Sequence, residues 1–191
     1  MPSIYDLKPK FQNLLRPSMR MLAAVGVSPN IVTIAAIAGS AAAGWCGAKH
    51  SLWALPVWLF LRMALNAIDG MMARELDQKS RLGAILNEAG DVVSDALLYG
   101  PLALLTDPWP VVIFVFGAAL TEFCGVLIQA LDGVRRYEGP MGKSDRAFAV
   151  GLLALVTSLW PALRDYWPPV FWILASMTLL TCIQRCRVRK A

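Results

Sequence analysis

Charged residues are scarce in this sequence. Only 16% of its 191 residues are Asp, Glu, Lys or Arg, whereas 57% are hydrophobic. Soluble domains contain about 25% charged and about 45–50% apolar residues. The low charge content excludes an ordinary soluble domain and indicates a lipid bilayer as the main solvent. The chain also lacks a Ser- or Gly-rich linker, so we predict a single domain over residues 1–191.

Histidine and cysteine are also rare, which argues against a zinc site or a disulfide scaffold. The sequence contains one histidine and four cysteines, and the cysteines lie within apolar stretches without Cys-x-x-Cys spacing. The first 20 residues lack an apolar core followed by a cleavage site, so they do not form a secretory signal peptide. Their apolar residues recur at roughly helical spacing. Residues 1–28 are therefore predicted to form an interfacial amphipathic helix, with a solvated surface helix as the alternative.

Six long apolar stretches follow, at residues 30–48, 52–73, 82–105, 110–132, 147–162 and 168–186. Each approaches the about 20 residues that a helix needs to cross a hydrocarbon core of about 30 Å. We therefore predict an all-α fold, a polytopic membrane bundle of six transmembrane helices preceded by the interfacial helix.

The distribution of basic residues supports this count. Six spans place both termini and two loops on one side of the membrane, and all but three of the 18 Lys and Arg residues fall there. Under the positive-inside rule this side is cytoplasmic, so we expect a multi-pass protein of the cell (inner) membrane with cytoplasmic N- and C-termini. The net charge of +5 then reflects topology and anionic membrane lipids, and requires no nucleic acid partner.

Polar residues suited to chemistry concentrate around the loop between the second and third stretches. Helical spacing places four residues on one face of the second helix: Asn66, Asp69, Gly70 and Ala73. Four others recur at every fourth position of the third helix: Gly83, Asn87, Asp91 and Asp95. If the two helices pack as antiparallel neighbours, these faces meet and surround a hydrated pocket near the membrane surface.

The intramembrane acids Asp91 and Asp95 need a compensating partner, because an ionised residue within a span costs about 2.5–3.5 kcal/mol. Carboxylate and amide oxygens are ligands that suit Mg²⁺ or Mn²⁺. We therefore predict a metal site formed by five residues: Asn66, Asp69, Asn87, Asp91 and Asp95. The alternative is a buried polar network that holds two helices together.

The same residues resemble the motif of the CDP-alcohol phosphatidyltransferase family, Asp-x2-Asp-Gly-x2-Ala-Arg-x8-Gly-x3-Asp-x3-Asp. The matching residues are Asp69, Gly70, Ala73, Arg74, Gly83 and Asp91. The match covers 26 residues, and six spans with a cytoplasmic motif between the second and third also resemble the family. Asn66 and Asn87 stand where the family has its first and third aspartates. The site then recovers charge from Glu88 and Asp95, holds one metal ion instead of two, or is catalytically impaired.

The resemblance implies a metal-dependent transferase of phospholipid biosynthesis. It would move a phosphatidyl or phospho-alcohol group from a CDP-linked lipid, CDP-diacylglycerol, to an acceptor alcohol and release CMP. Asp91 would be the catalytic base. The nucleotide would be bound by six residues: Asn30, Thr33, Gly70, Ala73, Arg74 and Gly83. Members of the family are often homodimers, which adds a second copy of the chain to the expected partners.

A basic group near the fifth stretch is a candidate site for an acidic acceptor such as an alcohol phosphate. It comprises Arg135, Arg136, Lys143 and Arg146. Positive-inside topology is the alternative explanation. Arg62 and Glu122 are further candidates because charge within a span is expensive, and Arg62 is placed to pair with a carboxylate of the site. The acceptor alcohol itself stays open between a simple alcohol and an alcohol phosphate.

Two other functions compete with this interpretation. A catalytically impaired protein of the same fold would bind the nucleotide-lipid or act as a scaffold, and the two asparagines favour it. A small ion-coupled transporter would have polar residues near the middle of several helices and internal repeats. The sequence shows neither feature, so we favour the enzyme.

Overall fold

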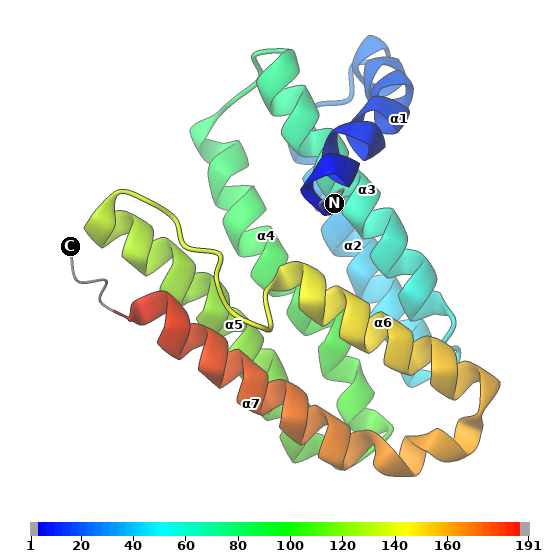
Figure 1. Ribbon diagram of the computed structural model, residues 1–191. Coiled ribbons are helices and arrows are strands. Elements are labelled where there is room, and N and C mark those ends of the chain that lie inside the picture. Colours follow the sequence, from blue (N-terminus) through cyan, green and yellow to red (C-terminus); the bar gives the residue numbers. More distant parts are fainter. Residues whose placement is uncertain (1–3, 188–191) are drawn as a thin grey trace.

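The computed structural model describes the backbone of residues 4–187 and the side chains of residues 11–187, and every regular element in that range is a helix. Figure 1 shows seven α-helices: α1 (Ile4–Ala24), α2 (Pro29–Ala48), α3 (Ala54–Glu75), α4 (Arg81–Tyr99), α5 (Pro108–Asp132), α6 (Lys143–Leu159) and α7 (Trp167–Cys186). Short 3-10 segments, η1 (Gly100–Leu104) and η2 (Pro161–Tyr166), follow α4 and precede α7. The six predicted apolar stretches correspond to α2 through α7.

Four helical segments are long and apolar enough to cross a membrane, namely Pro29–Ala48, Ala54–Glu75, Pro108–Asp132 and Pro161–Cys186. The other two helices are less apolar or shorter. Helix α4 carries Glu88, Asp91 and Asp95, and α6 has 17 residues. The all-helical class is confirmed, whereas a count of six spans stays a prediction.

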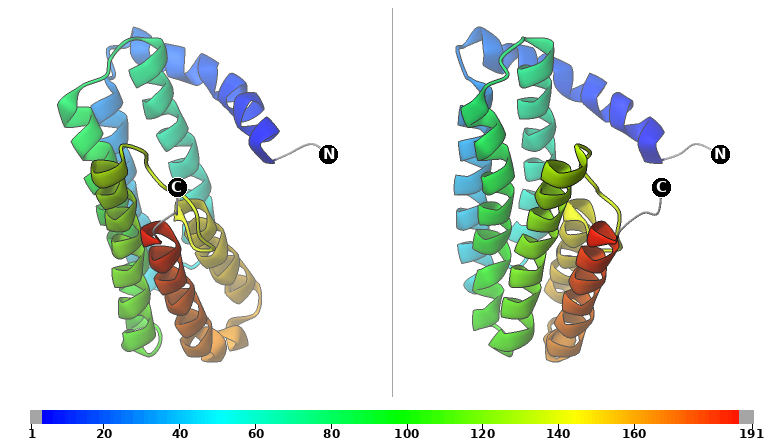
Figure 2. Two further views of the ribbon diagram at one scale, coloured as in Figure 1. Left: turned by 60° about the vertical axis from the view of Figure 1, so that its left-hand side comes forward. Right: turned by 90° about the vertical axis from the view of Figure 1, so that its left-hand side faces the viewer.

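All six helices of the bundle share one polar end, defined as the end at which α2, α4 and α6 begin and α3, α5 and α7 end. Figure 2 shows α1 at this end, running obliquely to the bundle. An ion pair of 2.9 Å between Arg16 and Glu75 joins α1 to the last turn of α3. An edge-to-face contact between Phe11 and Phe60 adds a second link between these two helices.

Local sequence signals set the helix boundaries at the polar end. Ser28 caps α2 by accepting a hydrogen bond from the Ile31 backbone NH, and Pro29 occupies the first helical turn. Ser80 caps α4 in the same way, because its Oγ accepts from the Gly83 NH at 2.9 Å. Gly133 ends α5 in the left-handed region, with a φ of 74°, which glycine adopts without steric strain.

Helix α2 packs extensively against both α3 and α4, whereas α3 and α4 make few direct contacts with each other. The two helices therefore do not pack closely against each other, which was the condition for their motif-bearing faces to meet directly. Because α2 lies beside both helices, it keeps their polar ends apart. The two motif-bearing faces consequently meet across an open volume.

Small residues bring α2 and α4 close together along a parallel seam. A Cβ atom on Gly44 would lie 2.1 Å from the Leu97 carbonyl oxygen, so only glycine permits this approach. Nearer the polar end, a Cβ on Gly90 would lie 3.1 Å from the Ile37 side chain. These contacts recur at heptad spacing on both helices, so α2 and α4 stay in register from one end of the seam to the other.

The core lies away from the polar end and is rich in aromatic residues. The rings of Tyr99, Phe114, Phe171 and Trp167 form a continuous series with centroid distances of 5.7, 5.6 and 5.9 Å. In contrast, many large apolar side chains are exposed on the outer faces of the helices, for example Phe116 on α5. Exposed apolar surface of this extent is expected for helices surrounded by lipid.

Candidate active site

A cavity of about 420 Å³ opens at the polar end between α2, α3 and α4. Residues of all three helices and of the α3–α4 loop line it: Pro29, Asn30, Thr33, Asp69, Gly70, Ala73, Arg74, Gln78, Lys79, Ser80, Gly83, Ala84, Asn87 and Glu88. All six residues predicted to bind the nucleotide are among them. The cavity therefore brings together side chains that are more than 50 positions apart in the sequence.

Glycines make room for this cavity. A Cβ on Gly83 would lie 3.0 Å from both the Asn30 Oδ1 and the Ser80 Oγ atoms, so any side chain there would displace cavity-lining oxygens. A Cβ on Gly70 would lie 3.1 Å from the Arg74 Nη1 atom. The Arg74 guanidinium thus lies against the backbone of its own helix, at the edge of the cavity, where it can meet an anionic ligand.

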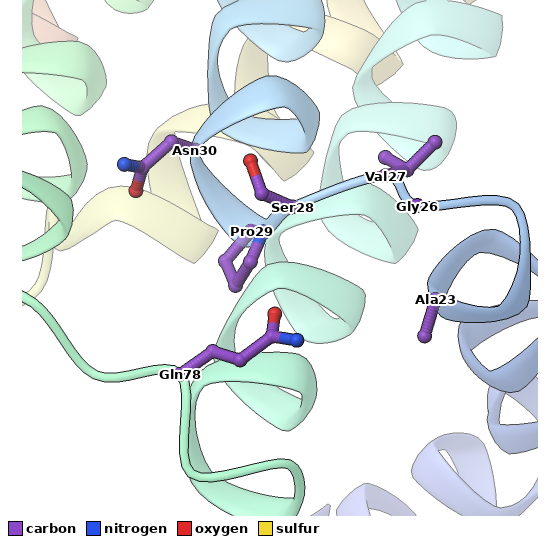
Figure 3. Close-up of a pocket in the computed structure, with 7 residues that line it drawn as sticks. All are labelled: Ala23, Gly26, Val27, Ser28, Pro29, Asn30 and Gln78. Atoms are coloured by element: carbon purple, nitrogen blue, oxygen red, sulfur yellow. The ribbon is translucent and has the colours of Figure 1, made fainter.

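A second cavity, of about 250 Å³, adjoins the first at the α1–α2 linker. Figure 3 shows its lining, with Asn30 and Gln78 on one side and Ala23 on the other. Pro29, Asn30 and Gln78 line both cavities, so the two form one continuous cleft. The cleft thus extends from the motif residues of α3 and α4 to the linker between α1 and α2.

Oxygen atoms from two helices face the main cavity. Asp69 is 5% exposed, and its Oδ2 accepts a hydrogen bond of 2.8 Å from the Thr33 Oγ1. Asn87 faces the cavity from α4. Among the described residues, no group of three His, Cys, Asp or Glu side chains could hold a metal ion by itself. These donors do suit Mg²⁺ or Mn²⁺ held jointly with substrate, because such ions commonly use one or two carboxylates together with substrate phosphates.

Asp91 lies one helical turn beyond Asn87 and contacts cations rather than the cavity. Its carboxylate forms an ion pair with Lys143, and the Arg62 Nη2 atom lies 3.6 Å from it. Arg62 also donates to the Asp91 backbone carbonyl oxygen at 3.2 Å. Asp91 therefore lies at the boundary between the cavity and the charged interior of the bundle.

Asp95, one further turn along α4, is buried between two arginines. Arg62 donates to its Oδ1 at 2.6 Å and Arg146 to its Oδ2 at 2.9 Å. Arg62 thus pairs with a carboxylate of the motif region, as its position suggested. The five residues predicted to bind metal therefore have different surroundings. Asp69 and Asn87 lie at the cavity, Asp91 at its boundary and Asp95 deep in an ion-pair network. Asn66 is half-buried on α3 and is not among the residues that line the cavity.

Glu122 on α5 is the centre of that network. Its carboxylate lies 2.9 Å from Arg146, 3.1 Å from Arg135 and 4.0 Å from Arg185. Arg135 also pairs with Glu88. Burial is the largest single effect on the pKa of Arg135 and lowers it, but the hydrogen bond and charge attraction to Glu88, together with the charge of Glu122, outweigh burial, so the pKa is raised and this guanidinium stays charged.

The structure separates the four residues predicted to bind an acidic acceptor. Arg146 is fully buried and binds Asp95, Glu122 and Thr121. Arg136 instead contacts Asp132 at 2.9 Å and the backbone carbonyl oxygens at the end of α7. Lys143 alone among the four contacts Asp91.

Sequence reasoning missed Arg185 as part of this network. Arg185 is 2% exposed and donates to the Thr121 carbonyl oxygen at 2.5 Å. It was counted only among the basic residues of the cytoplasmic side. A helical stripe of buried polar residues, formed by Thr178, Thr181 and Arg185 on an otherwise apolar helix, was the signal that could have revealed it.

Comparison with known proteins agrees with this geometry. Residues 26–184 match the CDP-alcohol phosphatidyltransferase family. The inner membrane protein YnbA of Escherichia coli is 48% identical over 97% of this chain and 95% of its own length. The phosphatidylinositol phosphate synthase of Mycobacterium tuberculosis is 30% identical, over 92% of this chain and 85% of its own length.

Solved structures of the mycobacterial synthase have the same fold. A crystal structure with CDP-DAG bound superposes with a TM-score of 0.76 and 26% identity, covering 91% of this chain and 92% of the other. A second, in complex with manganese and citrate, gives the same TM-score over 90% of this chain and 86% of the other.

These matches confirm the resemblance that the motif indicated. They also confirm the predicted enzyme class, a membrane transferase of phospholipid synthesis that uses a CDP-alcohol. The chain therefore belongs to the CDP-alcohol phosphatidyltransferase family.

Proposed function

We propose that this protein transfers the phosphatidyl group of CDP-diacylglycerol to a small acceptor alcohol and releases CMP. The observation that carries this proposal is the cavity between α2, α3 and α4, because all six predicted nucleotide-binding residues line it. The binding of CDP-DAG by the mycobacterial synthase of similar fold supports the choice of donor.

The cleft suits the donor's polar head. We place the cytidine and pyrophosphate along Asn30, Thr33 and Gly83, with Arg74 beside a phosphate oxygen. The acyl chains would leave the cleft toward the lipid-exposed faces of the helices. Gly70 and Ala73 have no side chain or only a methyl group on this side of the cleft, so that the pyrophosphate can approach the α3 backbone.

Asn66, Asp69, Asn87 and Asp91 are the residues we assign to a divalent metal site, Mg²⁺ or Mn²⁺. The manganese complex of the mycobacterial synthase supports this assignment. When bound, the ion would neutralise charge that develops on the phosphoryl oxygens. We assign Asp95 instead to the positioning of Arg62 and Arg146, since both of its oxygens already bind these arginines.

The transfer is a substitution at phosphorus. The acceptor hydroxyl oxygen forms a bond to the phosphatidyl phosphorus, and the bond from that phosphorus to the bridging pyrophosphate oxygen breaks. CMP leaves with the bridging oxygen. Asp91 accepts the hydroxyl proton, and its neighbours Lys143 and Arg62 hold its carboxylate at the boundary of the cavity.

We place the acceptor next to Asp91, at the start of α6. Lys143 contacts Asp91 there, and Arg135 and Arg146 lie behind it with their carboxylate partners. Arg136 faces the end of α7 and would act on the acceptor only through that segment. The acceptor hydroxyl would thus approach the donor from the α6 side of the cleft.

The proposal includes an arrangement of the helices in the membrane. We propose that α4 and α6 span the bilayer together with the four apolar segments, as one domain with α1 at the interface. Both termini and the polar end would face the cytoplasm of a cell whose inner membrane holds the protein, and two copies would form a homodimer. The inner-membrane name of the Escherichia coli relative and the basic residues at the polar end support this orientation.

The test is CMP release by purified protein in lipid. CDP-diacylglycerol, Mg²⁺ or Mn²⁺, and a panel of acceptors would be supplied, with Asp91→Asn measured in parallel. We expect metal-dependent release that requires an acceptor and is lost in the variant.

A catalytically impaired binding protein is the second candidate, and Asn66 and Asn87 are the residues that favour it. It predicts that CDP-diacylglycerol binds but that no combination of metal and acceptor releases CMP. That result would overturn the proposed transfer and leave the donor site intact.

A further inference from the structure

Every cation of the predicted acceptor group already has an acidic partner. Arg135 pairs with Glu88 and Glu122. Arg136 pairs with Asp132, and Lys143 with Asp91. Arg146 pairs with both Asp95 and Glu122. Each of these four positive charges thus has an internal carboxylate partner before any substrate binds, and the carboxylates of Asp91, Asp95 and Glu122 also pair with Arg62 or Arg185.

Glu122 holds the position that a bound anion would take. Three guanidinium groups from different parts of the chain converge on its two carboxylate oxygens, at 2.9, 3.1 and 4.0 Å. The Glu122 side chain is 9% exposed, so its charge is buried together with its partners. A phosphate among the same arginines would have to displace this carboxylate or lie against it.

Such a displacement is unfavourable on two grounds. A carboxylate and a phosphate carry like charges, and like charges brought together in a partly buried site repel strongly. A carboxylate that lost its guanidinium partners would also remain buried without compensation. The network therefore discriminates against an anionic acceptor by means of a fixed negative charge.

We infer that the acceptor is an alcohol without a phosphate group, neutral or zwitterionic, and that Glu122 determines this preference. The inference rests on the proposed transfer and specifies its acceptor. The chemistry at phosphorus is unchanged, because Asp91 needs only a hydroxyl group with a removable proton. The hydroxyl groups or the ammonium group of such an acceptor can contact Glu88 or Asp91 at the edge of the network.

The first experiment compares matched acceptors in the CMP-release assay. Glycerol is paired with glycerol 3-phosphate, inositol with inositol phosphate, and serine with phosphoserine. We expect at least one phosphate-free alcohol to react about tenfold or more faster than its phosphate ester. Faster release with the phosphate esters would overturn the inference while it supports the proposed transfer.

The second experiment measures binding and does not require turnover. Inorganic phosphate is titrated against wild-type protein, Glu122→Gln and the control Glu75→Gln, each with CDP-diacylglycerol present to occupy the donor cleft, and the Tm is followed. Gln keeps the shape of the side chain but removes its charge. We expect a phosphate-dependent rise in Tm for Glu122→Gln, with an apparent affinity about tenfold or more above that of the wild type.

Glu75→Gln is a matched control because it removes one carboxylate at the end of α3, where its partner is Arg16. We expect it to respond to phosphate as the wild type does.

Equal phosphate binding by the wild type and Glu122→Gln would overturn the inference, and so would a folded Glu122→Gln that gains no binding. If Glu122→Gln fails to fold, wild-type protein that phosphate stabilises would overturn the inference, and wild-type protein without that response would support it. Absence of CMP release with every acceptor would overturn the proposed transfer, and this binding comparison would still decide the role of Glu122.

Discussion

Two polar regions lie side by side at the same end of the bundle, and they differ in how their polar groups are used. In the cleft between α2, α3 and α4, most of the motif residues, among them Asp69, Gly83 and Asn87, face an open volume. In the network formed by residues of α3, α4, α5, α6, α7 and the α5–α6 loop, arginines and carboxylates bind one another. A high density of charge therefore does not by itself mark a ligand site. A ligand site is indicated when polar groups are arranged around a cavity.

Helix α4 contributes to both regions and shows the transition between them. Asn87 lines the cleft, Asp91 pairs with Lys143 at the boundary, and Asp95 is buried between two arginines. These residues have the same helical spacing and similar chemistry. Their distance from the polar end decides whether each one meets a ligand or another side chain.

The largest expected effect concerns the cleft. Asp69→Asn removes one of the two carboxylates assigned to the metal site, and CMP release should fall by about 100-fold or more. The Tm should stay close to that of the wild type, because Asn can still accept the hydrogen bond from Thr33. Chelation of divalent metal should reproduce the loss in the wild type. An Asp69→Asn variant that keeps more than about one tenth of the activity would contradict the proposed site.

Substitutions in the ion-pair network should lower the thermal stability of the protein. Arg146→Met removes the fully buried cation that Asp95 and Glu122 share, and the loss of one side of a buried ion pair destabilises a protein by about 3–5 kcal/mol. Thermal unfolding in detergent measures this effect as a large drop in Tm. The control Arg16→Met removes an exposed ion pair and should leave the Tm unchanged. Equal Tm values for the two variants would show that the buried network does not stabilise the bundle.

Restoring the family's two missing carboxylates tests whether positions 66 and 87 contact the metal ion. The double variant Asn66→Asp with Asn87→Asp adds two negative charges near Asp69, so the metal concentration for half-maximal activity should fall about tenfold. Metal titration of CMP release measures this change. An unchanged titration curve would show that these two positions do not contact the ion.

The smallest effect is expected from Gly83→Ala. The new methyl group would displace Asn30 Oδ1 and Ser80 Oγ, each 3.0 Å away, and raise the KM for the CDP-alcohol about threefold with little change in kcat. Gly100→Ala is the matched control, because a Cβ there has no neighbour within 4 Å. A KM that rises equally in both variants would show that the cleft does not depend on Gly83.

Much of the fold was predictable because it depends on local pattern. Apolar stretches located α2 to α7, and Ser28 and Ser80 precede the helices they cap. The motif located the residues that line the cleft, since their spacing on α3 and α4 fixes their faces. The partners of Glu122 were not predictable, because Arg146 and Arg185 are brought to it by the packing of α6 and α7. The insertion of α2 between α3 and α4 also depends on tertiary packing.

The seam between α2 and α4 gives the cleft a mechanical sensitivity. Asn30 and Gly83 form its first contact at the cleft, and Gly44 and Leu97 form its last, about 20 Å away along α2. Both helices are stiff over this length, so a larger side chain at position 44 would change the angle between α2 and α4. The change in angle would appear at the opposite end, as a different width of the substrate entrance. Residues that never touch a substrate can in this way set how tightly it is held.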